Sequence, residues 1–225
     1  MSIADNLKQI MNDIPQGVTL IAVSKTKPAE AILEAYQQGQ KVFGENKVQE
    51  MAEKHDKLPK DILWHLIGHL QTNKVKYIAG FVHLIHSIDS LKLLKEVNKE
   101  GIKNNRIIDC LVQVHIAQED TKFGFSFHEA DELLSGQELK KLSHIRITGL
   151  MGMASNTEDK SQIKAEFKTL ADFFEKARQQ YTQKENVALT TLSMGMSGDY
   201  KIAMAAGSNM VRVGSAIFGD RNYAK

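Results

Sequence analysis

The stretch VTLIAVSKTKPAEAILEAYQQG, residues 18–39, contains the unit that is repeated along the chain. Its first half is a near-continuous apolar run, which is typical of a parallel strand buried on both faces. Pro28 fits the first turn of a helix and Gly39 fits a helix end, so the second half predicts a helix. Lys25 stands where the strand ends, and burying an ammonium group there without a partner is costly. The lysine therefore either extends to solvent or has a chemical role.

The same strand-then-helix unit recurs along the whole chain. Apolar runs predict eight strands, at residues 18–25, 41–46, 62–68, 82–89, 107–116, 144–151, 190–196 and 210–219. Helical patterns occupy residues 28–39, 46–58, 90–101, 127–142 and 156–181, and an amphipathic helix at residues 1–14 precedes the first strand.

This alternation predicts an α/β fold, namely a single closed (β/α)8 TIM barrel with an additional N-terminal helix. An open doubly wound sheet is the alternative. The chain has 225 residues and three prolines, and no linker or low-complexity tract divides it. We therefore predict a single domain over residues 1–225.

Composition excludes several classes of partner. Hydrophobic residues make up 42% of the chain, charged residues 25%, and the net charge is +2, which gives no reason to expect nucleic acid. No run reaches the roughly 18 apolar residues of a membrane span, and the N-terminal helix lacks the apolar core of a signal peptide. The single cysteine, Cys110, excludes a disulfide framework and favours a packing role. We predict a cytoplasmic protein with no membrane partner.

Polar and small residues gather where the predicted strands end. Lys25 ends the first strand and Asn46 the second, while GLMGMAS, SMGMSGD and RVGSAIFG end the sixth, seventh and eighth. Barrel enzymes carry the active site at this end, often with phosphate bound by the loops after strands seven and eight. Small residues let backbone N–H groups approach an anion. The last two loops therefore predict a phosphate site.

A lysine opposite a phosphate site favours one class of ligand, a phosphorylated aldehyde or ketone held as a Schiff base. Pyridoxal 5′-phosphate (PLP) fits this layout, and so does the substrate of a sugar-phosphate aldolase. His65 and His69 are four residues apart, but no cysteine or carboxylate cluster accompanies them, so we predict no metal.

Six stretches resemble the signature sequences of the PLP homeostasis protein family, also known as the proline synthase co-transcribed bacterial homologue family. They are AVSKTKP, FGENKVQE, WHLIGHLQTNK, GLMGM, SMGMSGDY and MVRVGSAIFG, in that order, and they reach from about residue 23 to residue 219. The resemblance implies a barrel similar to the N-terminal domain of alanine racemase, with PLP bound to Lys25 as an aldimine. Ser215 stands where the family often has threonine, and Gly198 stands where an acidic residue is common.

Seven residues form the expected cofactor site: Lys25, Asn46, Gly195, Ser197, Arg212, Gly214 and Ser215. We expect the two serines and Gly214 to bind phosphate, and Gly195 to shape the loop. Asn46 is expected to contact the ring side of the cofactor or to cap a helix beginning at Lys47, and the two roles are compatible. Lys27, two residues beyond the cofactor lysine, is expected in solvent.

Arg212 lies inside an apolar strand and needs a partner there. That partner is either a buried carboxylate or, through the similarity to alanine racemase, the pyridine nitrogen of PLP. Because arginine stays protonated, the ring nitrogen would then stay unprotonated, and the ring would be a weak electron sink.

Three functions remain as hypotheses. The first is a PLP-binding protein that takes part in intracellular PLP homeostasis and delivers PLP to apo-enzymes, without efficient catalysis. The second is an amino-acid racemase, and the third is a Schiff-base aldolase, which has no support beyond a lysine and phosphate loops. Racemases resembling this barrel carry a second β domain that supplies a tyrosine acid, whereas this chain ends at DRNYAK, soon after the eighth strand. We therefore favour the first function, without catalytic residues, and the family suggests a monomer.

Overall fold

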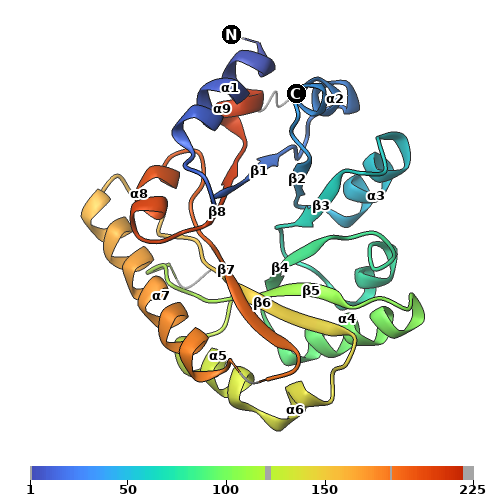
Figure 1. The fold of residues 1–225 in the computed structure, drawn as a ribbon, viewed down its shortest axis with the longest axis vertical. Coiled ribbons are helices and arrows are strands. Elements are labelled where there is room, and N and C mark those ends of the chain that lie inside the picture. The colour runs from blue at the N-terminus through green and yellow to red at the C-terminus, as the bar shows by residue number, and fades with distance from the viewer. Residues whose placement is uncertain (1, 120–122, 183, 220–225) are drawn as a thin grey trace.

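The computed structural model describes residues 2–119, 123–182 and 184–219. In these ranges eight parallel strands follow one another in chain order around a closed barrel (Figure 1). They are β1 Thr19–Val23, β2 Val42–Glu45, β3 Leu63–Leu66, β4 Leu84–Ile88, β5 Ile108–Gln113, β6 Ile145–Met151, β7 Val187–Ser193 and β8 Met210–Val213. Because β1 pairs with both β2 and β8, the barrel closes, which confirms the predicted TIM barrel and excludes an open sheet.

The helices lie outside the ring of strands (Figure 1). They are α1 Ile3–Asp13, α2 Ala29–Gln37, α3 Val48–Lys57, α4 Leu91–Lys103, α5 Phe127–Ser135, α6 Gln137–Lys140, α7 Lys160–Gln180, α8 Tyr200–Ala205 and α9 Ser215–Phe218, with a 3₁₀ helix η1 at Thr72–Tyr77. Capping boxes begin α1 at Ser2 and α5 at Ser126. The expected additional N-terminal helix is thus present. Met1, and the end of the chain at 220–225 used in the argument against a racemase, lie outside the described residues.

Several boundaries differ from the sequence-based expectation. The helix expected at 127–142 is divided at Gly136, whose backbone is extended, with φ −64° and ψ 152°. The eighth strand, expected to reach residue 219, stops at Val213, because Gly214 turns the chain into α9. Strand β7 begins at Val187 instead of residue 190, and η1 was not expected. A short apolar run does not distinguish a strand from a buried helical turn.

Buried apolar side chains form two clusters. The smaller one contains a residue from each of five strands: Ile21, Leu84, Leu111, Met151 and Met210. The larger one lies between strands and helices and includes Phe43, Trp64 and Phe167, all fully buried. Side chains on both faces of the strands are therefore packed, as the continuous apolar runs predict.

Helix α1 covers the seam where the last strand meets the first. It lies beside α9 (Figure 1), and Asn6 Nδ2 donates a hydrogen bond of 3.0 Å to the carbonyl of Ile217. The N-terminal helix thus holds the helix that follows β8 in place.

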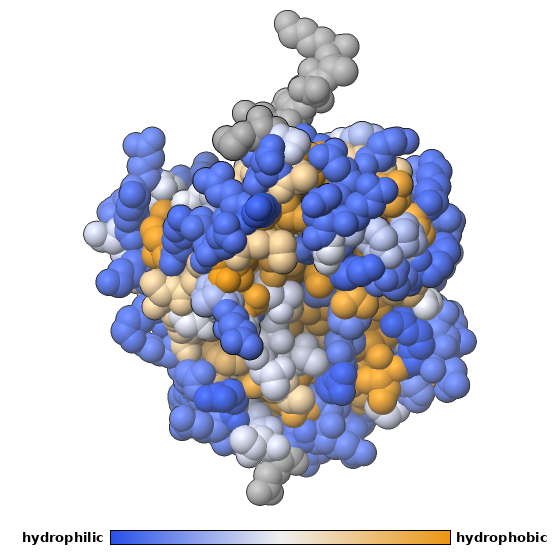
Figure 2. Space-filling view, turned by 45° about the horizontal axis from the view of Figure 1, so that its top comes forward, coloured by the Kyte–Doolittle hydropathy of each residue, from blue (hydrophilic) through white to orange (hydrophobic). Residues whose placement is uncertain are grey.

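The surface is mostly polar on the face shown in Figure 2, where hydrophilic residues surround smaller apolar patches. Within the part of the chain that the structure describes, no helix is both long and apolar enough to cross a membrane. Cys110 is buried on β5, and burial raises the pKa of its thiol.

Candidate functional site

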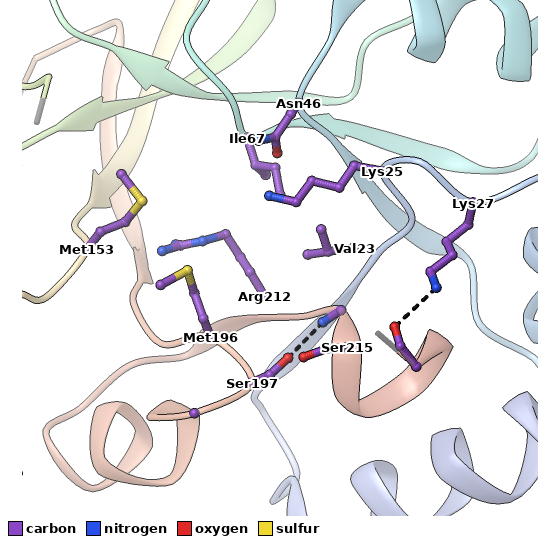
Figure 3. A pocket seen from close by; sticks show the side chains of 13 residues that line it. Val23, Lys25, Lys27, Asn46, Ile67, Met153, Met196, Ser197, Arg212 and Ser215 are labelled. Atoms are coloured by element: carbon purple, nitrogen blue, oxygen red, sulfur yellow. Dashed lines mark hydrogen bonds between the residues drawn. The ribbon is translucent and has the colours of Figure 1, made fainter. Parts of the chain in front are cut away.

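A cavity of about 290 Å³ opens at the carboxyl ends of the strands, next to the seam between β1 and β8. Six of the seven predicted site residues line it: Lys25, Asn46, Ser197, Arg212, Gly214 and Ser215. The seventh, Gly195, is not among the described lining residues. Figure 3 shows that the lining side chains come from the ends of several strands and approach one common space.

Lys25 follows β1 and extends its side chain into this space, toward the side chain of Arg212 (Figure 3). The next residue, Thr26, has φ 65°, in the left-handed region that a threonine rarely adopts. Such a conformation is maintained only when surrounding contacts hold it.

Those contacts come from a buried ionic network behind the lysine. Ser24 Oγ donates to Glu45 Oε1 at 2.6 Å, and the Thr26 amide donates to Glu50 Oε1 at 2.6 Å. Lys54 Nζ, on α3, donates to both carboxylates at 2.7 Å and to the Ser24 carbonyl at 2.8 Å. The backbone is therefore fixed on both sides of Lys25.

Replacing the central cation of this network is expected to destabilise the fold. Lys54→Met should lower the free energy of unfolding by about 3 kcal/mol, because Glu45 would remain buried without its partner. Urea denaturation measures the change. Lys57→Met on the same helix is the matched control, since Lys57 is exposed. Equal losses in the two variants would contradict the role of the network.

Lys27, which was expected in solvent, is half-buried and hydrogen-bonded. Its Nζ donates to the carbonyls of Phe218, at 2.8 Å, and Gly219, at 3.1 Å. These carbonyls lie at the end of α9, where a helix leaves acceptors without intrahelical partners. Lys27 thus ties the loop after β1 to the helix after β8.

Arg212 is buried on β8, with 4% of its surface exposed. Its Nη1 donates to the carbonyl of Ser193 at 3.0 Å and to the Ser193 hydroxyl at 2.6 Å, and its Nη2 donates to the Gly152 carbonyl at 3.0 Å. Among the described residues no carboxylate lies within ion-pair distance of the guanidinium, so the expected alternative of a carboxylate partner is wrong. Burial lowers the pKa of Arg212 to about 10, while the charge of Asp199 acts in the opposite direction. The side chain therefore stays a cation at neutral pH.

The loops after β7 and β8 meet at the other end of the cavity. Ser197 Oγ accepts a hydrogen bond of 3.1 Å from the Gly214 amide. Ser215 begins α9, and both serine side chains lie at this end (Figure 3). Hydroxyls and first-turn amides together form a set of donors suited to an anion.

Gly195 shapes the first of these loops from outside the cavity. It has φ +93°, and a Cβ there would lie 2.7 Å from Ala203 Cβ and 2.8 Å from Tyr200 Cα. Only glycine allows this turn and the close packing of α8.

Asn46 follows β2 and points into the cavity (Figure 3). The alternative role, as cap of α3, is wrong, because the cap position is Lys47 and no side chain bonds there. A Cβ on Gly68 would lie 2.4 Å from the Asn46 carbonyl oxygen, so the loops after β2 and β3 are in close contact.

The apolar wall of the cavity includes Ile67, Met153 and Met196. Ile67 was not singled out from the sequence. The ionic network behind Lys25 was also missed. Its Glu50 and Lys54 have the i,i+4 spacing of a helical ion pair, which was the available signal.

The two histidines considered as metal ligands have different partners. His65 Nδ1 lies 3.0 Å from His86 Nε2, and His69 Nδ1 lies 3.0 Å from Asp89 Oδ2. Over residues 2–119, 123–182 and 184–219, no group of three or more His, Cys, Asp or Glu side chains could hold a metal ion.

Comparison with known sequences shows the family. The family described as alanine racemase, N-terminal domain, matches residues 1–222. A pyridoxal phosphate homeostasis protein of Aquifex aeolicus is 40% identical over 205 residues, which cover 91% of this chain and 87% of that protein. The chain belongs to the pyridoxal phosphate homeostasis protein family. This confirms the resemblance of the six sequence stretches.

Solved structures agree with membership of the PLP homeostasis protein family. PipY of Synechococcus elongatus without PLP is 36% identical, with a TM-score of 0.90, and PipY with PLP bound is 35% identical, with a TM-score of 0.87. Each match covers 97% of this chain and 100% of PipY. Alanine racemase of Bartonella henselae is 16% identical, with a TM-score of 0.73 over 98% of this chain and 60% of that enzyme, and shares the fold.

Proposed function

We propose that this chain binds PLP in the cavity as an aldimine of Lys25, and that it takes part in PLP homeostasis and delivery without efficient catalysis. One observation carries the proposal. A lysine amine and a buried arginine face the same space, and a set of hydroxyl and amide donors closes its far end. The PLP-bound structure of PipY, a relative over nearly the whole chain, supports it. The single cysteine supports a cytoplasmic location.

The residues present fit the functional groups of PLP. The aldehyde requires an amine, which Lys25 supplies. The phosphate requires hydrogen-bond donors, which Ser197, Ser215 and the nearby amides supply. The pyridine nitrogen requires one donor, and the Arg212 guanidinium has five N–H groups, of which protein acceptors take three.

Arg212 also sets the electronic character of the bound ring. When bound, PLP supplies an electron sink that works best with a protonated ring nitrogen. Arg212 donates hydrogen bonds and gives up no proton at neutral pH, so it favours an unprotonated nitrogen. Because this role is inferred from the similarity to alanine racemase, it weakens the ring as an electron sink but does not by itself separate a carrier from an amino-acid racemase.

Transfer of PLP tests the carrier function. Protein loaded with PLP and passed through gel filtration should restore the activity of an apo PLP-dependent enzyme on mixing, without added cofactor. The Lys25→Ala variant should restore much less, because it retains less PLP. Lys47→Ala, an exposed lysine outside the cavity, is the control. Wild-type protein that binds PLP but never restores activity would contradict delivery.

The phosphate site should distinguish PLP from pyridoxal. The double variant Ser197→Ala, Ser215→Ala should weaken PLP binding by about 10²–10⁴-fold, because each hydrogen bond to a charged group contributes about 1.5–3 kcal/mol. Pyridoxal has no phosphate and should bind nearly as well as to the wild type. Absorbance titration with both ligands measures this, with exposed Ser161→Ala as control. Equal losses for the two ligands would exclude the phosphate role.

A further inference from the structure

Four buried polar side chains form a continuous row of hydrogen bonds below the cavity. Arg212 Nη1 lies 2.6 Å from Ser193 Oγ, which lies 3.2 Å from His86 Nδ1, and His86 Nε2 lies 3.0 Å from His65 Nδ1. The four residues come from β8, β7, β4 and β3, and none has more than 4% of its surface exposed. The row therefore crosses the interior of the barrel.

The far end of the row reaches a second cavity. This cavity, of about 350 Å³, is lined by His65 together with His83, Asp109, Arg146 and residues at the amino ends of β4, β7 and β8. The row thus connects the cavity at the carboxyl ends of the strands with another at their amino ends.

The chemistry of the four groups fixes the direction of the bonds. A guanidinium only donates, so Ser193 Oγ accepts from Arg212. The hydroxyl hydrogen then needs an acceptor, and His86 Nδ1 lies within reach. His86 must therefore carry its hydrogen on Nε2 and donate it to His65 Nδ1. This leaves His65, which lines the second cavity, with its own hydrogen on Nε2.

The electrostatics favour the same arrangement. In this direction every acceptor lone pair faces the cation and every hydrogen points away from it, and hydrogen bonds in such rows polarise one another. Burial lowers the pKa of His65 to about 3, and burial, His65 and Arg212 together lower the pKa of His86 well below its usual value. Both imidazoles are neutral, so each has one donor and one acceptor nitrogen.

We propose that Ser193, His86 and His65 are positioning residues, whose one-directional hydrogen-bond row holds the Arg212 guanidinium with its remaining N–H groups toward the ring nitrogen of PLP. The proposal rests on the proposed function. A carboxylate in place of Ser193 would take two guanidinium N–H groups in a fork. The neutral hydroxyl of Ser193 takes one N–H group and leaves the positive charge of Arg212 available to the ligand.

Histidine NMR of the PLP-loaded protein tests the direction of the row. Two-bond ¹H–¹⁵N correlations at neutral pH should show His65 and His86 as neutral imidazoles with the hydrogen on Nε2. In Ser193→Ala, His86 should lose this preference and show both tautomers, and Ser193→Thr, which keeps the hydroxyl, should restore it. A hydrogen on Nδ1 of either ring in the wild type, or an unchanged His86 in Ser193→Ala, would overturn the proposal.

The matched control is Ser87→Ala, because Ser87 is also fully buried, on β4, and its hydroxyl has no hydrogen-bond partner among the described residues. With ¹⁵N-labelled PLP, Ser193→Ala should bind about tenfold more weakly and shift the ring-nitrogen resonance, as expected for a weakened charged hydrogen bond. Ser87→Ala should change neither. If the wild type binds no PLP, the proposed function fails. If it binds PLP and the two variants behave alike, the positioning role alone is overturned.

Discussion

Borohydride reduction of the PLP-loaded protein is expected to fix a pyridoxyl group on Lys25, and the Lys25→Ala variant is expected to lose the yellow colour of the wild type. The amine of Lys25 extends into the cavity between the Arg212 side and the serine loops, and the ionic network of Glu45, Glu50 and Lys54 holds its backbone. Mass mapping of the reduced protein identifies the labelled lysine.

Lys27 is the critical comparison, because it is also a lining residue of the cavity. Its Nζ already donates to two carbonyls at the end of α9, so it is directed toward that helix. A pyridoxyl group on Lys27, or a stable aldimine in Lys25→Ala, would show that the assignment is wrong. Lys47→Ala should bind PLP as the wild type does.

Amino-acid racemisation by the loaded protein is expected to stay near background, far below the roughly 1–10³ per second usual for enzymes. In the proposed site Arg212 leaves the ring nitrogen unprotonated, which makes the ring a weaker electron sink. Racemisation also needs an acid on each face of the substrate, and a positioned acid or base contributes about 10²–10⁴-fold. Of the described residues that line the cavity, none is Tyr, His, Cys, Asp or Glu.

The measurement is incubation with L-amino acids in deuterated water, followed by NMR for exchange of the α-proton and by optical rotation for inversion. Inversion at enzymatic rates would contradict the carrier function and favour the racemase. Slow exchange without inversion agrees with the proposal, because Lys25 on one face still acts as a lone base, and Lys25→Ala should then abolish the exchange.

Most of the fold was predictable because its signals are local. The apolar run and helix of residues 18–39 reappear as β1 and α2. The other predicted strands are also present around the barrel. The prediction failed where one local sequence pattern is compatible with two kinds of structure. Residues 215–218 continue an apolar run but form α9, because Gly214 turns the chain. Gly136 was placed inside a helix, although glycine interrupts helices readily.

The cavity was predictable to the extent that strand ends meet at one edge of a barrel. Lys25 and Arg212 could be brought together in this way, since parallel strands place their carboxyl ends side by side. The row of hydrogen bonds behind Arg212 could not be predicted. His65 and His86 are 21 residues apart and His86 and Ser193 are 107 apart, so their contacts depend on strand register, which the sequence does not reveal.

The cavity lies across the seam where the first strand pairs with the last. Lys25 follows β1, whereas Arg212, Gly214 and Ser215 belong to β8 and α9. While β8 is still inside the ribosome, the nascent chain therefore has the Lys25 amine. It lacks the residues of β8 and α9 that are proposed to bind the ring and the phosphate. Ligand present in the cell acts only on the closed form, and at a hundred times its dissociation constant adds about 2.7 kcal/mol to the stability of that form. The chain therefore becomes able to bind ligand in the same step in which β8 closes the barrel.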